Sequence, residues 1–331
     1  MDIAGIAAVG SSRLWAAANE WTTPLGPANL AGGQRGVILH SRNGGKTWEE
    51  RFVAFGRDLS RVYFFNEQTG WVSGDAGLIL HTTDGGSSWQ AQSTRTNRSL
   101  LEVTFLSPLV GWVLASEGRL LRTLDGGLNW SEQEVAIDDH LYSLSFTDAY
   151  RGWVVGENGA YETADGGVTW KERRRDLLRN LLDWNTQLIE FKDVRFFDEQ
   201  TGFVSASVSV KNAGAHAVIF RTDDGGRKWR IVQVPGAHGL WSVQFVTRKE
   251  MWVVTSGPDP LVHTLDGGKS WRWFDCPGTV RRVHFVDSKS GWFIGHTDDF
   301  SSRGIFHTTD AGETWRNLVV GIEPNLRQQS R

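Results

Sequence analysis

A short motif of the form Ser/Thr-x-Asp/Asn-Gly/Ala-Gly-x-x-Trp recurs seven times along the chain. Its acidic or amide residues are Asn43, Asp84, Asp125, Asp165, Asp224, Asp266 and Asp310. Successive copies lie about 40 residues apart, except for a longer interval between Asp165 and Asp224. A period of this length is typical of repeat proteins in which each unit is one small supersecondary structure. The repeat therefore constrains the fold more than any single residue does.

Residues 59–92 show what one repeat builds. The segments 59–65, 71–74, 78–82 and 88–91 are rich in apolar, β-branched and aromatic residues and are separated by turn-forming residues. Four short strands joined by tight turns form an antiparallel meander. Seven such units predict an all-β fold, a seven-bladed β-propeller with four strands in each blade, which we expect to form a single domain over residues 1–320. The polar segment 321–331 is expected to be a flexible C-terminal tail.

The motif itself reads as scaffold. Gly85 and Gly86 can take the positive φ that the turn requires, and Asp84 can accept hydrogen bonds from backbone N–H groups of the same turn. The motif tryptophan can insert between neighbouring blades. A second aromatic residue recurs after the first turn of each unit, as Trp15, Trp71, Trp112, Trp153, Phe203, Trp252 and Trp292. We interpret both aromatic positions as inter-blade packing rather than as a ligand platform.

Composition excludes several classes of protein. The net charge of -3 gives no overall attraction to nucleic acid or to an anionic membrane, and no apolar run is long enough to span a bilayer. Cys276 is the single cysteine, so no internal disulfide forms, and we expect a buried, unreactive thiol. Residues 1–10 do not resemble a signal peptide. We therefore expect a monomer that binds no cofactor and no metal, cytoplasmic as written and periplasmic or lumenal if a leader was removed.

Strand order places the irregular segments on one face. In a meander, the loops between the second and third strands and the connections between blades lie at the end opposite to the motif turns. The insertions 20–35, 207–216 and 296–303 and the longest one, 173–191, therefore share a face. Leucines at helical spacing in 173–191 predict one amphipathic helix, whose apolar residues are Leu177, Leu178, Leu181, Leu182, Trp184 and Leu188. Its arginines either bind a partner or are simply solvated while the leucines dock on the propeller.

The full unit, Phe followed by Gly-Trp-x-x-Gly-x-x-Gly and then Thr-x-Asp-Gly-Gly-x-x-Trp, resembles the Asp-box or bacterial-neuraminidase repeat. It is similar to the photosystem II assembly/stability factor family over roughly residues 3–320. That resemblance implies a seven-bladed, non-enzymatic assembly chaperone that binds a client protein, such as a membrane-protein subunit, without inserting into the membrane itself. It also implies an arginine-rich binding patch. The arginines expected on the insertion-bearing face are Arg57, Arg61, Arg95, Arg98, Arg173, Arg174, Arg175, Arg179, Arg195, Arg281 and Arg282.

The alternative function is glycoside hydrolysis at the channel mouth, because Asp-box propellers also include sialidases. A sialidase needs a tyrosine nucleophile, and the chain offers only Tyr63, Tyr142, Tyr150 and Tyr161. A carboxylate pair with a raised pKa at the channel would favour this class. The histidines that precede four of the motifs, at positions 40, 81, 263 and 307, lie in different blades, too far apart to share a metal ion. We expect them to be surface residues of the third strands.

Overall fold

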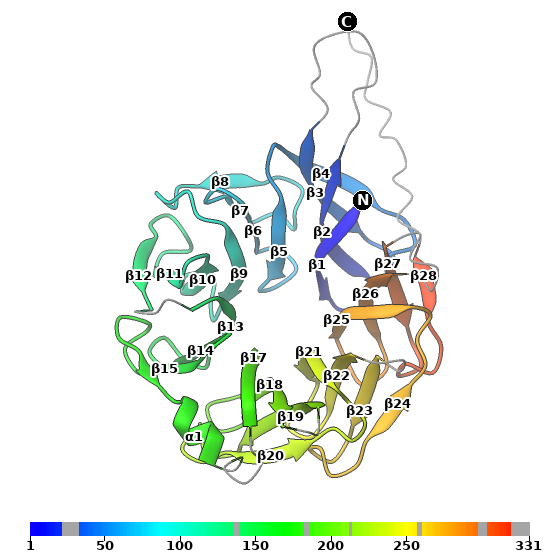
Figure 1. Ribbon diagram of the computed structural model, residues 1–331. Helices are drawn as coiled ribbons and strands as arrows, with labels where there is room; N and C mark the ends of the chain where they lie inside the picture. Colours follow the sequence, from blue (N-terminus) through cyan, green and yellow to red (C-terminus); the bar gives the residue numbers. More distant parts are fainter. Residues whose placement is uncertain are drawn as a thin grey trace, which may run out of the picture.

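Seven four-stranded antiparallel sheets surround a central axis in the computed structural model of the chain (Figure 1). The structure describes residues 1–21, 33–135, 139–179, 181, 186–211, 214–256, 260–296 and 303–318. Within each sheet the strands follow sequence order from the axis to the periphery, so every blade is a meander. The predicted seven-bladed propeller is confirmed.

The strands fall into four concentric sets. The innermost strands are β1 (Asp2–Val9), β5 (Leu59–Phe64), β9 (Leu100–Phe105), β13 (Leu141–Phe146), β17 (Thr186–Phe196), β21 (Gly239–Phe245) and β25 (Thr279–Phe285). The second strands are β2 (Arg13–Trp21), β6 (Gly70–Gly74), β10 (Gly111–Ala115), β14 (Gly152–Gly156), β18 (Gly202–Val210), β22 (Met251–Ser256) and β26 (Gly291–His296). The third strands are β3 (Gln34–Ser41), β7 (Ile79–Thr82), β11 (Arg119–Thr123), β15 (Ala160–Thr163), β19 (Gly214–Thr222), β23 (Leu261–Thr264) and β27 (Arg303–Thr308). The outer strands are β4 (Glu49–Phe55), β8 (Gln90–Gln92), β12 (Ser131–Glu134), β16 (Lys171–Glu172), β20 (Arg230–Gln233), β24 (Arg272–Phe274) and β28 (Arg316–Leu318).

The Asp-box turn of the second blade is held by its own side chains. The hydroxyl of Thr82 donates to Oδ1 of Asp84 over 2.8 Å and accepts the N–H of Gly86 over 2.9 Å. Oδ1 of Asp84 also accepts the N–H of Ser88 over 2.9 Å. Hydrogen bonds from the hydroxyl and N–H of Ser88 lower the pKa of Asp84 to about 2. In the first blade the amide oxygen of Asn43 takes the same role, and the carboxylates of the other blades accept the equivalent N–H, as found at Asp125, Asp165, Asp224, Asp266 and Asp310.

These turns also define the two faces of the propeller. The N–H of Gly85 donates to the carbonyl of Gln68 over 2.8 Å, so the Asp-box turn docks on the first turn of the same blade. We call this side the Asp-box face. The loops between second and third strands and the connections between blades lie at the other ends of the strands. We call that side the insertion face.

Aromatic side chains join neighbouring blades. The ring of Trp15 stacks on Phe64 of the next blade, with centroids 3.7 Å apart, and its Nε1 donates to the carbonyl of Gly85 over 3.2 Å. Trp71 repeats both contacts one blade further on, with Phe105 and the next Asp-box turn. Trp292 closes the ring, because it packs in one cluster with Ile3 and Leu14 of the first blade and with other residues of the last. The predicted inter-blade packing is what the structure shows.

The prediction that the motif histidines are surface residues is wrong for two of them. His40 and His263 lie directly across the strand pair from Trp15 and Trp252, with ring centroids 4.9 and 4.0 Å apart. Both imidazoles are buried, because each covers one face of its tryptophan. Burial, reinforced by Arg51, lowers the pKa of His40 to about 4, and burial lowers the pKa of His263 as well.

The helix predicted over 173–191 is much shorter in the structure. Helix α1 spans Arg174–Leu178, between β16 and β17, and the prediction is wrong for 186–191, which belong to β17. There Ile189 and Phe191 are buried while Leu188 is exposed, the alternation of a strand paired with β18. Leu177 and Leu181 do pack between blades four and five. Leu182 and Trp184 lie outside the described residues.

The other insertions differ in kind. The segment 207–216, predicted to be irregular, largely extends β18 and β19, whose pairing reaches Val210 and Gly214. The first insertion begins and ends as paired strand at Trp21 and Gln34. Residues 22–32 and 297–302 lie outside the described part of the chain. Blade five therefore carries the longest described strands of the insertion face.

Candidate interaction site at the central channel

A β-bulge interrupts every innermost strand at the same level. In blade two the register shifts between Leu59 and Arg61, which makes Ser60 the extra residue. The bulged residues around the ring are Ala4, Ser60, Leu101, Tyr142, Lys192, Trp241 and Arg281. The residues that follow them are Gly5, Arg61, Glu102, Ser143, Asp193, Ser242 and Arg282. Because a bulge bends the strand and redirects its side chains, it can set these two layers of residues around the axis.

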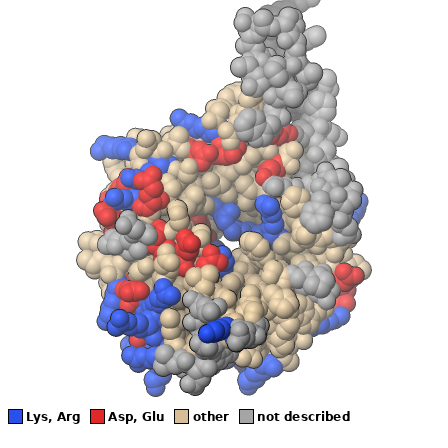
Figure 2. Space-filling model, in the orientation of Figure 1, with Lys and Arg blue, Asp and Glu red and all other residues tan. Residues whose placement is uncertain are grey.

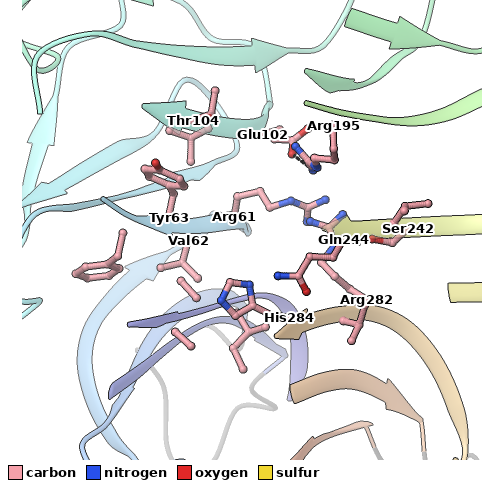
Figure 3. A pocket seen from close by; sticks show the side chains of 17 residues that line it. Arg61, Val62, Tyr63, Glu102, Thr104, Arg195, Ser242, Gln244, Arg282 and His284 are labelled. Carbon is pink, nitrogen blue, oxygen red and sulfur yellow. Dashed lines mark hydrogen bonds and ion pairs between the residues drawn. The ribbon is translucent and has the colours of Figure 1, made fainter. Parts of the chain in front are cut away.

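Four residues of the layer after the bulges line a cavity at the centre of the ring. Its volume is about 270 Å³. Arg61, Glu102, Ser242 and Arg282, from four different blades, line it together with Arg195 (Figure 3). Three guanidinium groups and one carboxylate therefore converge on one space from residues far apart in the sequence. Strand order predicts four arginines beside the channel near the starts of inner strands, namely Arg61, Arg195, Arg281 and Arg282. The structure brings Arg61, Arg195 and Arg282 together at the cavity, but Arg195 lies near the end of β17 rather than at its start.

Arg195 is the paired arginine of this group. Its Nη2 lies 2.6 Å from Oε1 of Glu102, its Nε lies 3.3 Å from Oδ1 of Asp193, and its Nη1 donates to the carbonyl of Leu144 over 3.1 Å. Burial would raise the pKa of Glu102, but Arg195, with Arg61 and Arg282, holds it below the usual range. Asp193 also accepts the hydroxyl proton of Ser143 and the N–H of Val243. This network ties together the inner strands of blades three to six.

Arg61 and Arg282 differ from Arg195. Nη1 of Arg61 donates to the backbone carbonyls of Ala4 and Ser60, each over 3.2 Å, while its Nε is buried without a partner. Among the described residues, neither Arg61 nor Arg282 forms an ion pair. Burial and the neighbouring guanidinium of Arg282 lower the pKa of Arg61, and burial lowers that of Arg282. Both remain cations at neutral pH. Two guanidinium groups that are not paired with a carboxylate, those of Arg61 and Arg282, thus face the cavity.

The predicted arginines between blades lie apart from this cavity. Arg57 and Arg95 are exposed in the connections after blades one and two. Arg98 forms ion pairs with Glu117 and Glu132. Arg281, the bulged residue of β25, is exposed beside Arg282.

The arginines of α1 form a second basic region at the edge of the propeller (Figure 2). Arg173 is held by Glu162 over 2.6 Å and by Asp176 over 3.2 Å. Arg174 donates to the carbonyl of Asn158 over 2.7 Å. Arg175 is exposed, and Arg179 lies 3.4 Å from Asp176 with 76% of its side chain exposed. The first two arginines fasten the helix, and the last two face solvent.

Two of the tyrosines and the carboxylates beside the channel are held by neighbouring groups. The hydroxyl of Tyr63 donates to the carbonyl of Phe105 over 2.7 Å, and burial raises its pKa to about 12. Burial and Asp139 raise the pKa of Tyr161. Glu102 and Asp193 share one guanidinium, and the pKa of Glu102 is lowered, opposite to what a general acid requires. Within the described residues, no group of three or more metal-ligating side chains is found.

The sequence profile of the family described as photosynthesis system II assembly factor YCF48 matches residues 29–93, 87–141, 128–205 and 179–331. The chain belongs to the Ycf48 family of photosystem II assembly factors. A relative of this Ycf48-family chain, the photosystem II assembly lipoprotein Ycf48 of Synechococcus sp. (strain CC9902), is 29% identical over 149 residues. The match covers 42% of the chain and 40% of that relative, so it spans less than half the relative's length.

Solved structures of Ycf48 share the fold. YCF48 bound to a D1 peptide superposes with a TM-score of 0.66 at 19% identity over 93% of both chains. YCF48 from Cyanidioschyzon merolae gives a TM-score of 0.64 at 19% identity over 95% of this chain and 96% of that one. An ancestral GH74 enzyme reaches 0.66 at 14% identity, covering 96% of this chain but 46% of the enzyme. At these identities the similarity shows the propeller fold. No helix in the described part of this Ycf48-family chain is long and apolar enough to cross a membrane.

Proposed function

We propose that the chain is a non-enzymatic assembly scaffold that binds a client protein on its insertion face, with the channel arginines as the anchor. The observation that carries the proposal is the cavity lined by Arg61 and Arg282, neither of which has an ion-pair partner among the described residues. Buried cations need compensating charge, and a client carboxylate would supply it. A guanidinium binds a carboxylate with two parallel hydrogen bonds, which fixes its orientation.

Two further observations support this function. The family is one of assembly factors, and one of its solved structures is described as bound to a D1 peptide. The client would therefore be a segment of a membrane-protein subunit that the scaffold holds during assembly. The carboxylates beside the channel are bound to Arg195, which argues against the alternative of glycoside hydrolysis.

Charge reversal of Arg281 and Arg282 tests the anchor. We expect the double variant Arg281→Glu/Arg282→Glu to bind a fluorescent D1 peptide at least tenfold more weakly than the unmodified chain, as measured by fluorescence anisotropy. The control is Arg42→Glu/Arg227→Glu, which makes the same charge change at exposed arginines of the Asp-box face. Thermal melts of both variants check folding, and Arg282→Glu alone serves if the double variant is unstable.

Equal weakening by the two double variants would show that only net charge matters. Unchanged binding by folded Arg281→Glu/Arg282→Glu would contradict the proposed anchor. Either result would move the binding surface away from the channel.

A further inference from the structure

Trp241 is exposed, unlike the tryptophans that pack between neighbouring blades. The tryptophans that follow the first turn of each blade, such as Trp15 and Trp71, are at most 3% exposed, whereas Trp241 on β21 is 61% exposed. It is the bulged residue of blade six, directly before the cavity-lining Ser242. Exposing a tryptophan costs the hydrophobic stabilisation that burial would give, so its position calls for a partner.

A second aromatic residue occupies the same level of the ring. Tyr142, the bulged residue of blade four, is also exposed, and Nζ of Lys192 lies 5.2 Å from the centre of its ring. Lys192 is the bulged residue of blade five, so three consecutive blades present Tyr142, Lys192 and Trp241 in order around the channel. The exposed Arg281 of blade seven follows.

The inner strands that carry these residues are fixed to one another. The N–H of Val243 on β21 donates to Asp193 on β17 over 3.2 Å. Gln244 on β21 exchanges two hydrogen bonds with the backbone of Phe285 on β25. Trp241 therefore lies on a strand that is hydrogen-bonded to both neighbouring inner strands, between Lys192 and Arg281 in the order of the blades. It directly precedes Ser242, which lines the cavity with Arg61 and Arg282 (Figure 3).

We propose that Trp241, supported by Tyr142, makes the channel mouth selective for a polypeptide segment in which an aromatic or large apolar side chain lies next to a carboxylate. The inference rests on the proposed function, because the carboxylate is the group that enters the cavity. The neighbouring side chain then packs on the indole outside it. Tryptophan and arginine are among the residues that most often dominate protein interfaces, and here Trp241 and Arg281 are the bulged residues of neighbouring blades. The carboxylate can be a chain terminus or an acidic side chain, since a guanidinium binds both alike.

Fluorescence anisotropy with four labelled octapeptides tests this selectivity. All contain a Gly-Ser host sequence. The first ends in Phe-Ala with a free carboxylate, the second is the same peptide amidated, the third has Ala in place of Phe, and the fourth is amidated and carries an internal Phe-Glu pair. We expect the unmodified chain to bind the first peptide roughly tenfold more tightly than the third, as suits one buried aromatic contact. Binding of the amidated second peptide shows whether the terminal carboxylate is required. Binding of the fourth peptide shows whether a glutamate side chain can replace it.

Trp241→Ala should abolish the preference for Phe over Ala while leaving binding of the Ala peptide unchanged. Tyr150→Ala is the matched control, because Tyr150 is 64% exposed on the Asp-box face. If the free carboxylate is required but Trp241→Ala keeps the Phe preference, the selectivity is wrong and the proposed function stands. If none of the four peptides binds the unmodified chain, both are overturned.

Discussion

Arg195 and Glu102, which are 93 positions apart in the sequence, form an ion pair of 2.6 Å beside the central channel. Glu102 also accepts the N–H of Leu144 from the blade between them. The pair thus spans blades three to five at the level of the bulges. Arg195 is therefore paired with carboxylates and links the inner strands, whereas Arg61 and Arg282 face the cavity without an ion-pair partner among the described residues.

Removing the charge of Glu102 should weaken the fold. Glu102→Gln leaves the guanidinium of Arg195 without its nearer carboxylate, and we expect a loss of about 2 kcal/mol in the free energy of unfolding, less than for a fully buried pair because solvent reaches Arg195. Urea unfolding measures the change. Glu117→Gln is the control, because the side chain of Glu117 is 73% exposed against 8% for Glu102, and it should leave the midpoint unaltered.

The Asp-box carboxylate should be replaceable by an amide but not by a methyl group. Asp84→Ala removes the acceptor for Ser88 and Thr82, at a cost of about 1–2 kcal/mol. Asp84→Asn keeps one acceptor oxygen, as Asn43 does in blade one, and should cost less. Chemical denaturation of the two variants gives the order. An equal loss in both would mean that charge, rather than the acceptor, holds the turn.

Gly86 should tolerate alanine poorly. It has φ of +80°, and a Cβ there would lie 2.7 Å from Nε1 of Trp15 in the neighbouring blade. Gly56 has φ of +70° with nothing near its Cβ position, so Gly56→Ala measures the backbone cost alone, about 1 kcal/mol. We expect Gly86→Ala to lower the thermal midpoint clearly more than Gly56→Ala. Similar shifts would show that the blades move apart without cost.

Acidification should destabilise the propeller before the Asp-box carboxylates titrate. The pKa of His40 is lowered to about 4 in the folded chain, so the unfolded chain binds more protons below its own pKa of about 6.5. The stability that His40 contributes is present above that pH and is lost as the pH falls toward 4. The pKa of Asp84 is lowered to about 2, so the stability that its carboxylate contributes is lost only as the pH falls from the ordinary aspartate pKa toward 2.

The variant His40→Gln tests the expected loss of stability as the pH falls from about 6.5 toward 4. The variant should reduce the slope of unfolding free energy against pH between 6 and 4, by up to about 1.4 kcal/mol per pH unit. His140→Gln, at an exposed histidine, controls for the loss of an imidazole. Identical slopes in the unmodified chain and His40→Gln would mean that another group carries the effect.

The repeat could be predicted because its signals are local. Asp84 acts within its own turn, and an aromatic residue such as Trp15 follows the first turn of every repeat, so the repeated pattern indicated blade number and inter-blade packing. The insertion after blade four was harder. Its leucines fit a helical period, but residues 186–191 pair with β18 as part of a strand. This pairing is a tertiary contact, which a local sequence pattern does not encode.

The candidate site was only partly visible in the sequence. Strand order placed Arg61, Arg195 and Arg282 near the channel, yet nothing local revealed that Glu102 and Asp193 neutralise only Arg195. The bulges were missed too, because a one-residue register shift leaves composition unchanged. The bulged residue lies one, two or six positions after the start of its inner strand, as for Ser60, Trp241 and Lys192, so no fixed spacing marks it.

The packing between the first and last blades determines how the ring can close. Each described sheet is built from strands that are consecutive in the chain, and Trp292 reaches the first blade by side-chain packing alone. No strand has to wait for a distant segment, so each blade can complete its hydrogen bonds as it leaves the ribosome. The ring then closes last, at a junction sealed by surface complementarity.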